Sequence, residues 1–280
     1  MIKIVTDSTC GVSKEFAEAN DIRVVPLKVM VGDKEFEEAF SDVKLEMYEE
    51  VAKTKIFPKT SLPSVQKFVE YFNEVIASGD IVLCITISST LSGTYNAAVV
   101  ARSSCAKPES VHVVDSGVAI QAVLGMIEEI LPKTKKDSNI KAILNDLENM
   151  KQESGVAFLP DTLSYLHKGG RISGLVSLIG TVLNIKPIIK FAKGILSNYK
   201  KALGLNSAIA SLVNVISRSV KKIFVVRIGN SQNCAKLKEA IDAKFADTAK
   251  IEEGLVGPVV GSHVGYAIGV AWVGTPTKNQ

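Results

Sequence analysis

A hydroxyl-rich turn, Thr86 to Asn96, holds the residues best suited to chemistry. It reads Thr-Ile-Ser-Ser-Thr-Leu-Ser-Gly-Thr-Tyr-Asn and lies between the apolar run 81–85 and the helix-like run 95–101. A turn that opens a helix directs unpaired backbone N–H groups and hydroxyl donors toward one point, where the helix dipole favours an anion. The pattern therefore predicts an anion-binding loop, although an ordinary helix-capping turn has the same composition.

The absence of lysine from this loop limits the anion that it can hold. A loop that binds a nucleoside triphosphate has the pattern G-x-x-x-x-G-K-[ST], because several phosphate charges and a magnesium ion must be balanced. The turn at 86–96 instead suits a small group with a single charge, such as a carboxylate.

A second group of hydroxyls precedes another predicted helix. The segment 57–64 reads Phe-Pro-Lys-Thr-Ser-Leu-Pro-Ser, and apolar residues from Val65 to Ile76 recur on one helical face. Ser61 is the predicted N-cap, with Pro63 in the first turn of the helix. Hydroxyl groups thus gather at two predicted helix starts.

These turns require a sheet that positions them. Three predicted strands, 2–6, 81–85 and 111–114, end in polar residues and lead into helices. This alternation is typical of an open, mostly parallel α/β sheet, in which ligands bind beyond the carboxyl ends of the strands. Asp7 and Asp115 follow two of these strands, and we expect them to cap helices rather than contact a substrate.

The second half of the chain has a different pattern, so we predict an N-terminal α/β domain at 1–153 and a C-terminal α+β domain at 154–280. We expect the basic segment 168–171 to be a flexible loop and Lys193-Gly194 to be the turn of a hairpin. The edge strand predicted at 24–31 belongs to the first half. The elements predicted for the second half are strands at 156–159, 223–228 and 267–273, the hairpin at 188–196, and helices at 174–183, 208–219 and 234–246.

Composition excludes several classes of protein. The chain has 280 residues, 46% of them hydrophobic, and a net charge of +4. Dispersed lysines give little support for nucleic-acid binding, and no apolar run is long enough to span a membrane. The four cysteines lack CxxC spacing, which argues against a zinc site and a disulfide framework. We expect no metal and no cofactor. Because the N-terminus begins with a strand rather than a signal sequence, we expect a cytoplasmic protein.

Six segments together resemble the signatures of DegV family proteins. Each is a weak match alone, but they occur in the same order and at matching separations over essentially the whole chain. The resemblance implies a two-domain protein that holds one long-chain fatty acid in a tunnel between its domains. The segments are Thr6–Thr9, Lys59–Ser64, Ser88–Tyr95, Asp115–Ser116, Leu166–Ser173 and Asn184–Ile188.

The resemblance also implies which residues hold the carboxyl group of the fatty acid. By position, Thr60 and Ser61 correspond to family residues that form hydrogen bonds with the carboxylate. Ser92 and the backbone N–H of Gly93 correspond to a second set of such donors. His263 corresponds to a family histidine near the head group. In such a site hydroxyls and amides hold a buried carboxylate without an ion pair.

The resemblance further implies a FakB-type carrier subunit of bacterial fatty acid kinase. Such a carrier is not itself an enzyme; a separate ATP-dependent kinase converts the bound fatty acid to acyl phosphate for phospholipid synthesis, and transient contact with a membrane fits this role. Arg171 and Lys201 are the residues expected at the kinase encounter. The family often has arginine where this chain has Lys200-Lys201, and lysine supplies a point charge rather than a bidentate fork. Leu62 and Glu38 also depart from the family pattern.

Two other functions fit parts of the sequence less well than the carrier. A serine hydrolase or acyltransferase would use Ser92 or Ser89 with His263 and Asp115, but neither serine lies in a G-x-S-x-G elbow. A Rossmann enzyme would need G-x-G-x-x-G after the first strand, and that pattern is absent there.

Overall fold

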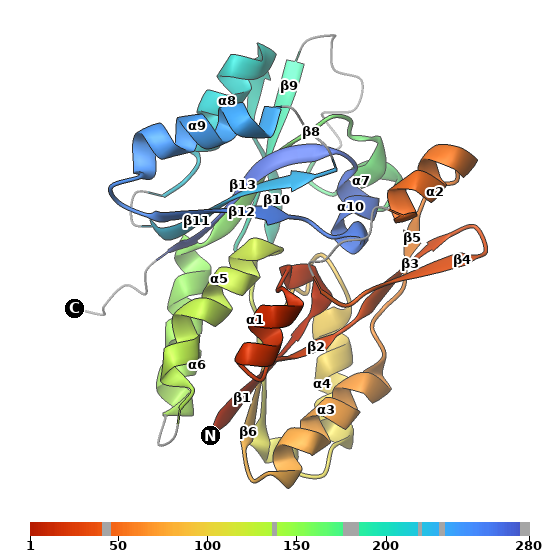
Figure 1. Ribbon diagram of the computed structural model, residues 1–280, viewed down its shortest axis with the longest axis vertical. Coiled ribbons are helices and arrows are strands. Elements are labelled where there is room, and N and C mark those ends of the chain that lie inside the picture. Colours follow the sequence, from red (N-terminus) through yellow and green to blue (C-terminus); the bar gives the residue numbers. More distant parts are fainter. Residues whose placement is uncertain (41–45, 136–138, 176–184, 218–219, 230–232, 275–280) are drawn as a thin grey trace.

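The computed structural model describes residues 1–40, 46–135, 139–175, 185–217, 220–229 and 233–274. In these ranges the strands form two larger sheets and a small one. In Figure 1 the first sheet lies in the lower half of the molecule and the second in the upper half. None of the described helices is long and apolar enough to cross a membrane.

The first sheet is parallel throughout, as predicted. Its central strands are almost completely buried, which explains their continuous apolar sequences. In spatial order the strands are β2 (Arg23–Val25), β1 (Ile2–Asp7), β6 (Ile81–Thr86) and β7 (Val111–Asp115). The accompanying helices are η1 (Ser8–Cys10), α1 (Lys14–Ala19), α3 (Val65–Ala77), α4 (Thr94–Ser104) and η2 (Pro108–Ser110).

The second sheet is antiparallel except for one parallel pair at its edge, β11 with β12. It therefore confirms a mixed α/β architecture with a second sheet. In spatial order its strands are β10 (Ile195–Leu203), β9 (Ile185–Ala192), β8 (Gly155–Pro160), β13 (Ala267–Gly274), β11 (Val220–Ile228) and β12 (Lys250–Leu255). Its helices are α7 (Ser164–Lys168), α8 (Gly204–Asn214), α9 (Asn233–Phe245) and α10 (Pro258–Val264).

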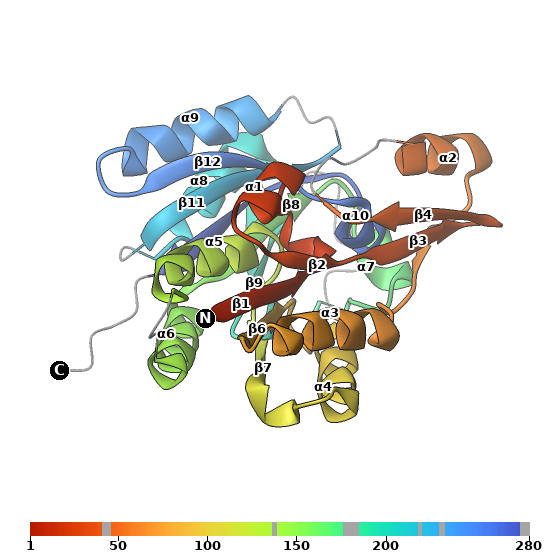
Figure 2. The same ribbon diagram turned by 60° about the horizontal axis from the view of Figure 1, so that its bottom comes forward.

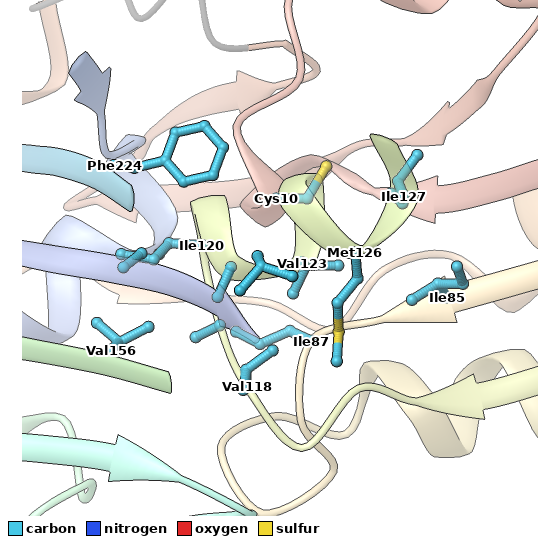
Figure 3. Packing of buried hydrophobic residues seen from close by; sticks show 14 of the residues in the cluster. Cys10, Ile85, Ile87, Val118, Ile120, Val123, Met126, Ile127, Val156 and Phe224 are labelled. Carbon is cyan, nitrogen blue, oxygen red and sulfur yellow. The ribbon is translucent and has the colours of Figure 1, made fainter. Parts of the chain in front are cut away.

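Two helices from the first half of the chain pack against this second sheet. They are α5 (Gln121–Ile130) and α6 (Ile140–Glu153), and η3 (Leu131–Lys133) joins them. A Cβ atom at Gly125 would lie 2.4 Å from the side chain of Val273, so glycine allows α5 to approach β13 closely. Figure 3 shows Val123 and Met126 of α5 in one cluster with Ile85 and Phe224, which come from different sheets. The division near residue 153 stays a prediction.

The predicted edge strand at 24–31 is wrong in one respect, because it divides at Pro26 between two sheets. Pro26 has no N–H to continue the ladder. After it, β3 (Leu27–Val31) pairs with β4 (Lys34–Glu38) and β5 (Lys59–Thr60) in the small sheet. Figure 2 shows β3, β4 and α2 (Glu46–Thr54) extending away from the body of the molecule.

The predicted hairpin is confirmed but is longer than expected, since β9 and β10 extend on both sides of the turn at Lys193-Gly194. The helix predicted at 208–219 instead begins at Gly204 and ends at Asn214. Strand β12 and helix α10 were missed, because neither has a strong periodic pattern. The helix predicted at 174–183 lies largely outside the described residues.

Candidate ligand-binding site

A cavity of about 300 Å³ lies between the carboxyl ends of the first-sheet strands and one face of the second sheet. Its walls are mainly apolar and include Ile87, Ile120, Phe158, Phe191 and Val226. The first two come from turns that follow β6 and β7, and the others come from the second sheet. The polar lining residues are Thr9, Thr60, Ser61, Ser92, Arg171, Arg227 and His263.

Ile120 reaches the cavity wall through a strained backbone. Its φ of 50° and ψ of −139° place it outside the regions that branched side chains normally adopt. It directly precedes α5, which is held against the second sheet, and its side chain is buried. The strained turn therefore directs a large apolar group toward the cavity.

Thr60 and His263 meet in the cavity wall near Arg171, which donates to the carbonyl oxygen of Gly169 beside His263, and this part of the wall is called its polar end. The Oγ1 atom of Thr60 lies 2.8 Å from Nε2 of His263, although 203 positions separate the two residues in the sequence. Burial, helped by the positive charge of Arg171, lowers the pKa of His263 to about 4. The imidazole is therefore neutral at physiological pH and brings hydrogen-bonding groups, rather than charge, to the site.

Gly169 lies so close to His263 that a larger residue would not fit at position 169. A Cβ atom at Gly169 would lie 2.5 Å from Nδ1 of His263 and 2.9 Å from the carbonyl oxygen of Tyr165. Nδ1 itself makes no well-formed hydrogen bond to the described residues. The close contact fixes α7 and α10 beside each other at the cavity.

Two carboxylates hold the hydroxyl-rich turn in place. Asp7 accepts a hydrogen bond from the backbone N–H of Ile87 at 2.8 Å, and burial raises its pKa. Asp115 accepts hydrogen bonds from the N–H groups of Ser89 at 3.2 Å and Gly117 at 2.9 Å. Asp7 also caps η1 by accepting a hydrogen bond from the N–H of Thr9 at 3.1 Å, as expected. Asp115 caps no described helix, contrary to the expectation, because Ile120 is the N-cap of α5 and no side chain caps that helix.

The turn ends in a helix start that leaves donors available. Gly93 is the N-cap of α4, and no side chain caps the helix there. Ser92 Oγ accepts a hydrogen bond from the N–H of Thr94 at 3.3 Å and lies 2.9 Å from Thr94 Oγ1. Among the described residues, no protein acceptor takes the N–H of Gly93. Ser92 lines both the apolar cavity and an adjoining polar one, whereas Gly93 lines only the polar one.

Arg171 is held between two loops, and the segment expected as a flexible loop begins with Lys168 at the end of α7. Its Nε donates to the carbonyl oxygen of Leu91 at 3.1 Å, and its Nη1 donates to that of Gly169 at 2.6 Å. These bonds use two of the five N–H donors of the guanidinium. Partial burial lowers its pKa, but arginine remains charged.

Ser61 is not the N-cap of α3, contrary to the sequence prediction. Ser64 takes that place, and its Oγ accepts a hydrogen bond from the N–H of Lys67 at 3.2 Å. Pro63 accordingly precedes the helix instead of occupying its first turn. Ser61 is exposed and still lines the cavity, so its hydroxyl is not used for capping.

Lys200 and Lys201 lie apart from this site. Both are exposed on β10, the edge strand of the second sheet, and neither lines the cavity. The hairpin predicted at 188–196 ends before these lysines, but strand β10 continues through them to Leu203.

The described contacts do not assemble the hydrolase triad. The hydroxyl of Ser89 donates to Asp115. His263 pairs instead with Thr60, and neither Ser89 nor Ser92 forms a hydrogen bond with it in the described structure. A nucleophile, a base and an orienting acid are therefore not aligned as this chemistry requires.

Glu38 supports the helix that carries His263, and the sequence did not predict this role. It is 5% exposed, and its Oε2 accepts a hydrogen bond from the N–H of Val259 at 2.8 Å, at the start of the helix that carries His263. Burial raises its pKa to about 8. Its sequence context, Lys-Glu-Phe-Glu-Glu, is typical of a solvated strand and gives no sign of this role.

Comparison with known proteins agrees with this architecture. Residues 1–275 match a family described as "Uncharacterised protein, DegV family". A DegV domain-containing protein of Clostridium acetobutylicum is 34% identical, with 97% of each chain covered.

Solved structures show the same fold. A protein from Eubacterium ventriosum, described as a stearic acid-binding protein, has a TM-score of 0.87 at 25% identity, with 98% of each chain covered. DegV of Bacillus subtilis, described as a fatty acid binding protein, has a TM-score of 0.84 at 28% identity, with 98% of this chain and 99% of that one covered. The matched length, the identity and the shared fold together show that this chain belongs to the DegV family.

Proposed function

We propose that this protein binds one long-chain fatty acid in the apolar cavity, with the carboxylate at its polar end. The observation that carries the proposal is an apolar cavity of about 300 Å³ at whose polar end the Thr60–His263 pair lies. The descriptions of the structures from E. ventriosum and B. subtilis as fatty-acid-binding proteins support the same ligand.

The acyl chain supplies most of the affinity in this proposal. Burial of about fifteen methylenes at ~0.8 kcal/mol each is worth on the order of 12 kcal/mol before the costs of association. The polar groups then determine which way round the ligand binds and which chemical class is accepted. The carboxylate must lie at these groups, because an unpaired carboxylate in an apolar cavity is strongly unfavourable.

Thr60 and Ser92 are the proposed hydroxyl donors to the carboxylate, with the N–H of Gly93 and the hydroxyl of Ser61 beside them. In the tautomer that carries its hydrogen on Nε2, His263 donates to Thr60 Oγ1, and the hydrogen of the Thr60 hydroxyl is then directed to the ligand. This chain of donors holds an anion without an ion pair, so the carboxylate stays reactive.

We further propose that the protein is a FakB-type carrier that presents the carboxylate to a separate ATP-dependent kinase. The sequence has no Walker A lysine and no kinase glycine loop, so the phosphoryl donor would come from the partner. Arg171 would face the reacting group, and Lys201 would contribute to the encounter with the kinase. A cytoplasmic carrier of this kind would exchange its lipid in transient contact with a membrane.

The first test is whether the protein purified from its host contains a fatty acid. Denaturing extraction followed by mass spectrometry is expected to give about one long-chain fatty acid per chain. A protein that is empty and does not take up added fatty acid, or that contains a nucleotide, would contradict the proposal.

The second test separates lipid binding from presentation to the kinase. Arg171→Ala is expected to keep fatty acid binding and to lower acyl phosphate formation with the kinase by at least about a hundredfold, because a transition-state cation is removed. Glu239→Ala, an exposed position on α9, is the matched control. Equal loss of binding and of product formation in Arg171→Ala would assign the arginine to ligand binding alone.

A further inference from the structure

The side chain of Leu62 is both exposed and part of the wall of the apolar cavity. It is 65% exposed, and it lines the cavity together with Thr60 and Ser92. An exposed leucine by itself needs no explanation, because apolar atoms make up much of the surface of any protein. Leu62 differs from other exposed apolar residues because it lies beside the groups that we propose to hold the carboxylate.

The backbone on both sides of Leu62 is fixed. The N–H of Ser61 donates to the carbonyl oxygen of Lys28 at 3.2 Å, next to the residues through which β5 pairs with β3. Pro63 is buried, and Ser64 is the N-cap of α3. The side chain of Leu62 therefore extends from a segment that is held at both ends.

This side chain lies directly against Gly93. A Cβ atom at Gly93 would lie 2.8 Å from Cδ2 of Leu62 and 3.6 Å from Cδ1, and its third nearest neighbour is Cγ of the same leucine. Gly93 has a φ of −72° and a ψ of 6°, a conformation that residues with a side chain also adopt. The absence of a side chain at Gly93 is thus needed for the close contact with Leu62 and not for the backbone conformation.

The contact lies beside donors that the protein leaves free. Among the described residues, no protein acceptor takes the N–H of Gly93, and no side chain caps α4 there. The neighbouring hydroxyl of Ser92 lies 2.9 Å from Thr94 Oγ1 and lines the apolar cavity. Both groups are proposed donors to the ligand carboxylate, so an apolar side chain lies next to the atoms that would hold its negative charge.

An apolar group in this position changes the strength of the hydrogen bonds beside it. Where water reaches a donor, it competes with the ligand, and the net gain from the hydrogen bond is small. Where a side chain excludes water, the local dielectric constant falls and hydrogen bonds to an anion become stronger. Contacts that exclude water in this way contribute little energy of their own.

We propose that Leu62 covers the carboxylate end of the bound fatty acid and keeps water from the donors of Ser92 and Gly93. The inference rests on the proposed function. Leu62 forms no hydrogen bond with the ligand and is a positioning residue that acts on the hydrogen bonds of its neighbours. Because hydrogen bonds to a charged acceptor are stronger than those to a neutral one, the cover favours a carboxylate over an uncharged head group.

The test compares a fatty acid with the alcohol of the same chain length. Displacement of a fluorescent fatty acid from delipidated protein gives both dissociation constants for the wild-type protein and for Leu62→Ala. The substitution is expected to weaken binding of the acid about fivefold and binding of the alcohol less than about twofold. Any lost contact with the acyl chain is common to both ligands, so the ratio of the two constants isolates the effect on the carboxylate.

Gly93→Ala tests the same contact from the other side. The added methyl group displaces the side chain of Leu62, and the backbone conformation at this position accepts alanine. The variant should therefore show the same selective loss of acid binding. In the double variant the methyl group fits into the space that the leucine leaves, so acid affinity should be no lower than in Leu62→Ala alone.

Leu203→Ala is the matched control. Leu203 is 75% exposed on β10 and does not line the apolar cavity. Truncation of an exposed leucine at this position should leave the affinities for the acid and for the alcohol equal to those of the wild-type protein.

Three results would overturn the inference while the proposed function stands. The first is acid binding by Leu62→Ala that is unchanged or tighter, and the second is equal weakening of acid and alcohol in that variant. The third is a double variant in which the effects of the two substitutions multiply, since independent effects would show that they do not act through one contact. A wild-type protein that binds no fatty acid would refute the proposed function, and the inference with it.

Discussion

At the scale of single residues, the polar end of the cavity depends on pairs that are distant in the sequence. Thr60 contacts His263, and Arg171 contacts the carbonyl oxygen of Leu91. The sequence identified Thr60, Ser92 and Arg171 because each lies in a short motif. Their assembly at one site was implied only by the family resemblance, and the contact of Gly169 with His263 was not predicted at all, since no local pattern encodes a neighbour about ninety positions away.

Thr60→Val tests the proposed donor at this scale. Valine has nearly the same shape, so the substitution removes the hydroxyl and leaves the carboxylate with one hydrogen bond fewer. We expect fatty acid affinity to fall about tenfold, corresponding to roughly 1–2 kcal/mol. Displacement of a fluorescent fatty acid measures the change.

Thr248→Val is the matched control, because Thr248 is exposed after α9 and does not line the cavity. Its fatty acid affinity should equal that of the wild-type protein. An unchanged affinity in Thr60→Val would remove Thr60 from the carboxylate site.

At the scale of elements, the small sheet supports the site from outside. Glu38 at the end of β4 accepts a hydrogen bond from Val259 of α10, and α10 carries His263. A Cβ atom at Gly257 would lie 2.3 Å from the Glu38 carboxylate, so glycine is needed where α10 begins. The β3–β4 hairpin thus helps to fix the position of a helix that lines the cavity.

This contact predicts a pH dependence of stability. The pKa of Glu38 rises from its ordinary value of 4.5 to about 8 in the folded protein. Between these pH values the native state binds more protons than the unfolded state, so stability falls as pH rises from about 4.5 to 8. Each pKa unit corresponds to about 1.4 kcal/mol, so the total loss is on the order of a few kcal/mol.

Glu38→Gln tests this origin, because glutamine keeps an acceptor for the Val259 N–H and cannot ionise. The free energy of unfolding in urea, measured at pH 5 and pH 8, should differ less in the variant than in the wild-type protein. Part of the difference remains, because burial also raises the pKa of Asp7. Glu37→Gln, at an exposed position of the same strand, should keep the full difference; an equal slope in all three proteins would exclude Glu38 as its source.

At the scale of the whole molecule, the cavity is lined by segments from both halves of the chain. The N–H of Gly194 at the hairpin turn donates to the carbonyl oxygen of Gly117 at 2.8 Å, and Thr90 contacts the same turn. Helix α5 packs between the two larger sheets. A ligand in this space therefore contacts both sheets at once and should stabilise the fold as a unit.

Ligand binding should accordingly raise thermal stability. With free fatty acid at a hundred times its Kd, mass action adds about 2.7 kcal/mol to the free energy of unfolding. Thermal unfolding of delipidated protein, with and without fatty acid below its micelle-forming concentration, measures the effect. The alcohol of the same chain length should raise the unfolding temperature less than the fatty acid does. An equal rise would show that the site does not distinguish a carboxylate from a hydroxyl group.

Much of this architecture follows from local sequence patterns. Continuous apolar runs that end in TDST, SSTLSGT and DSG predict buried parallel strands with helix starts at one edge, because strand burial and helix capping depend on neighbouring residues. Only the tertiary structure decided that the chain changes sheets at Pro26, that α5 and α6 pack against the second sheet, and that α10 brings His263 to Thr60. These features depend on contacts between distant segments, and such contacts are selected by packing of the whole core rather than by any local pattern.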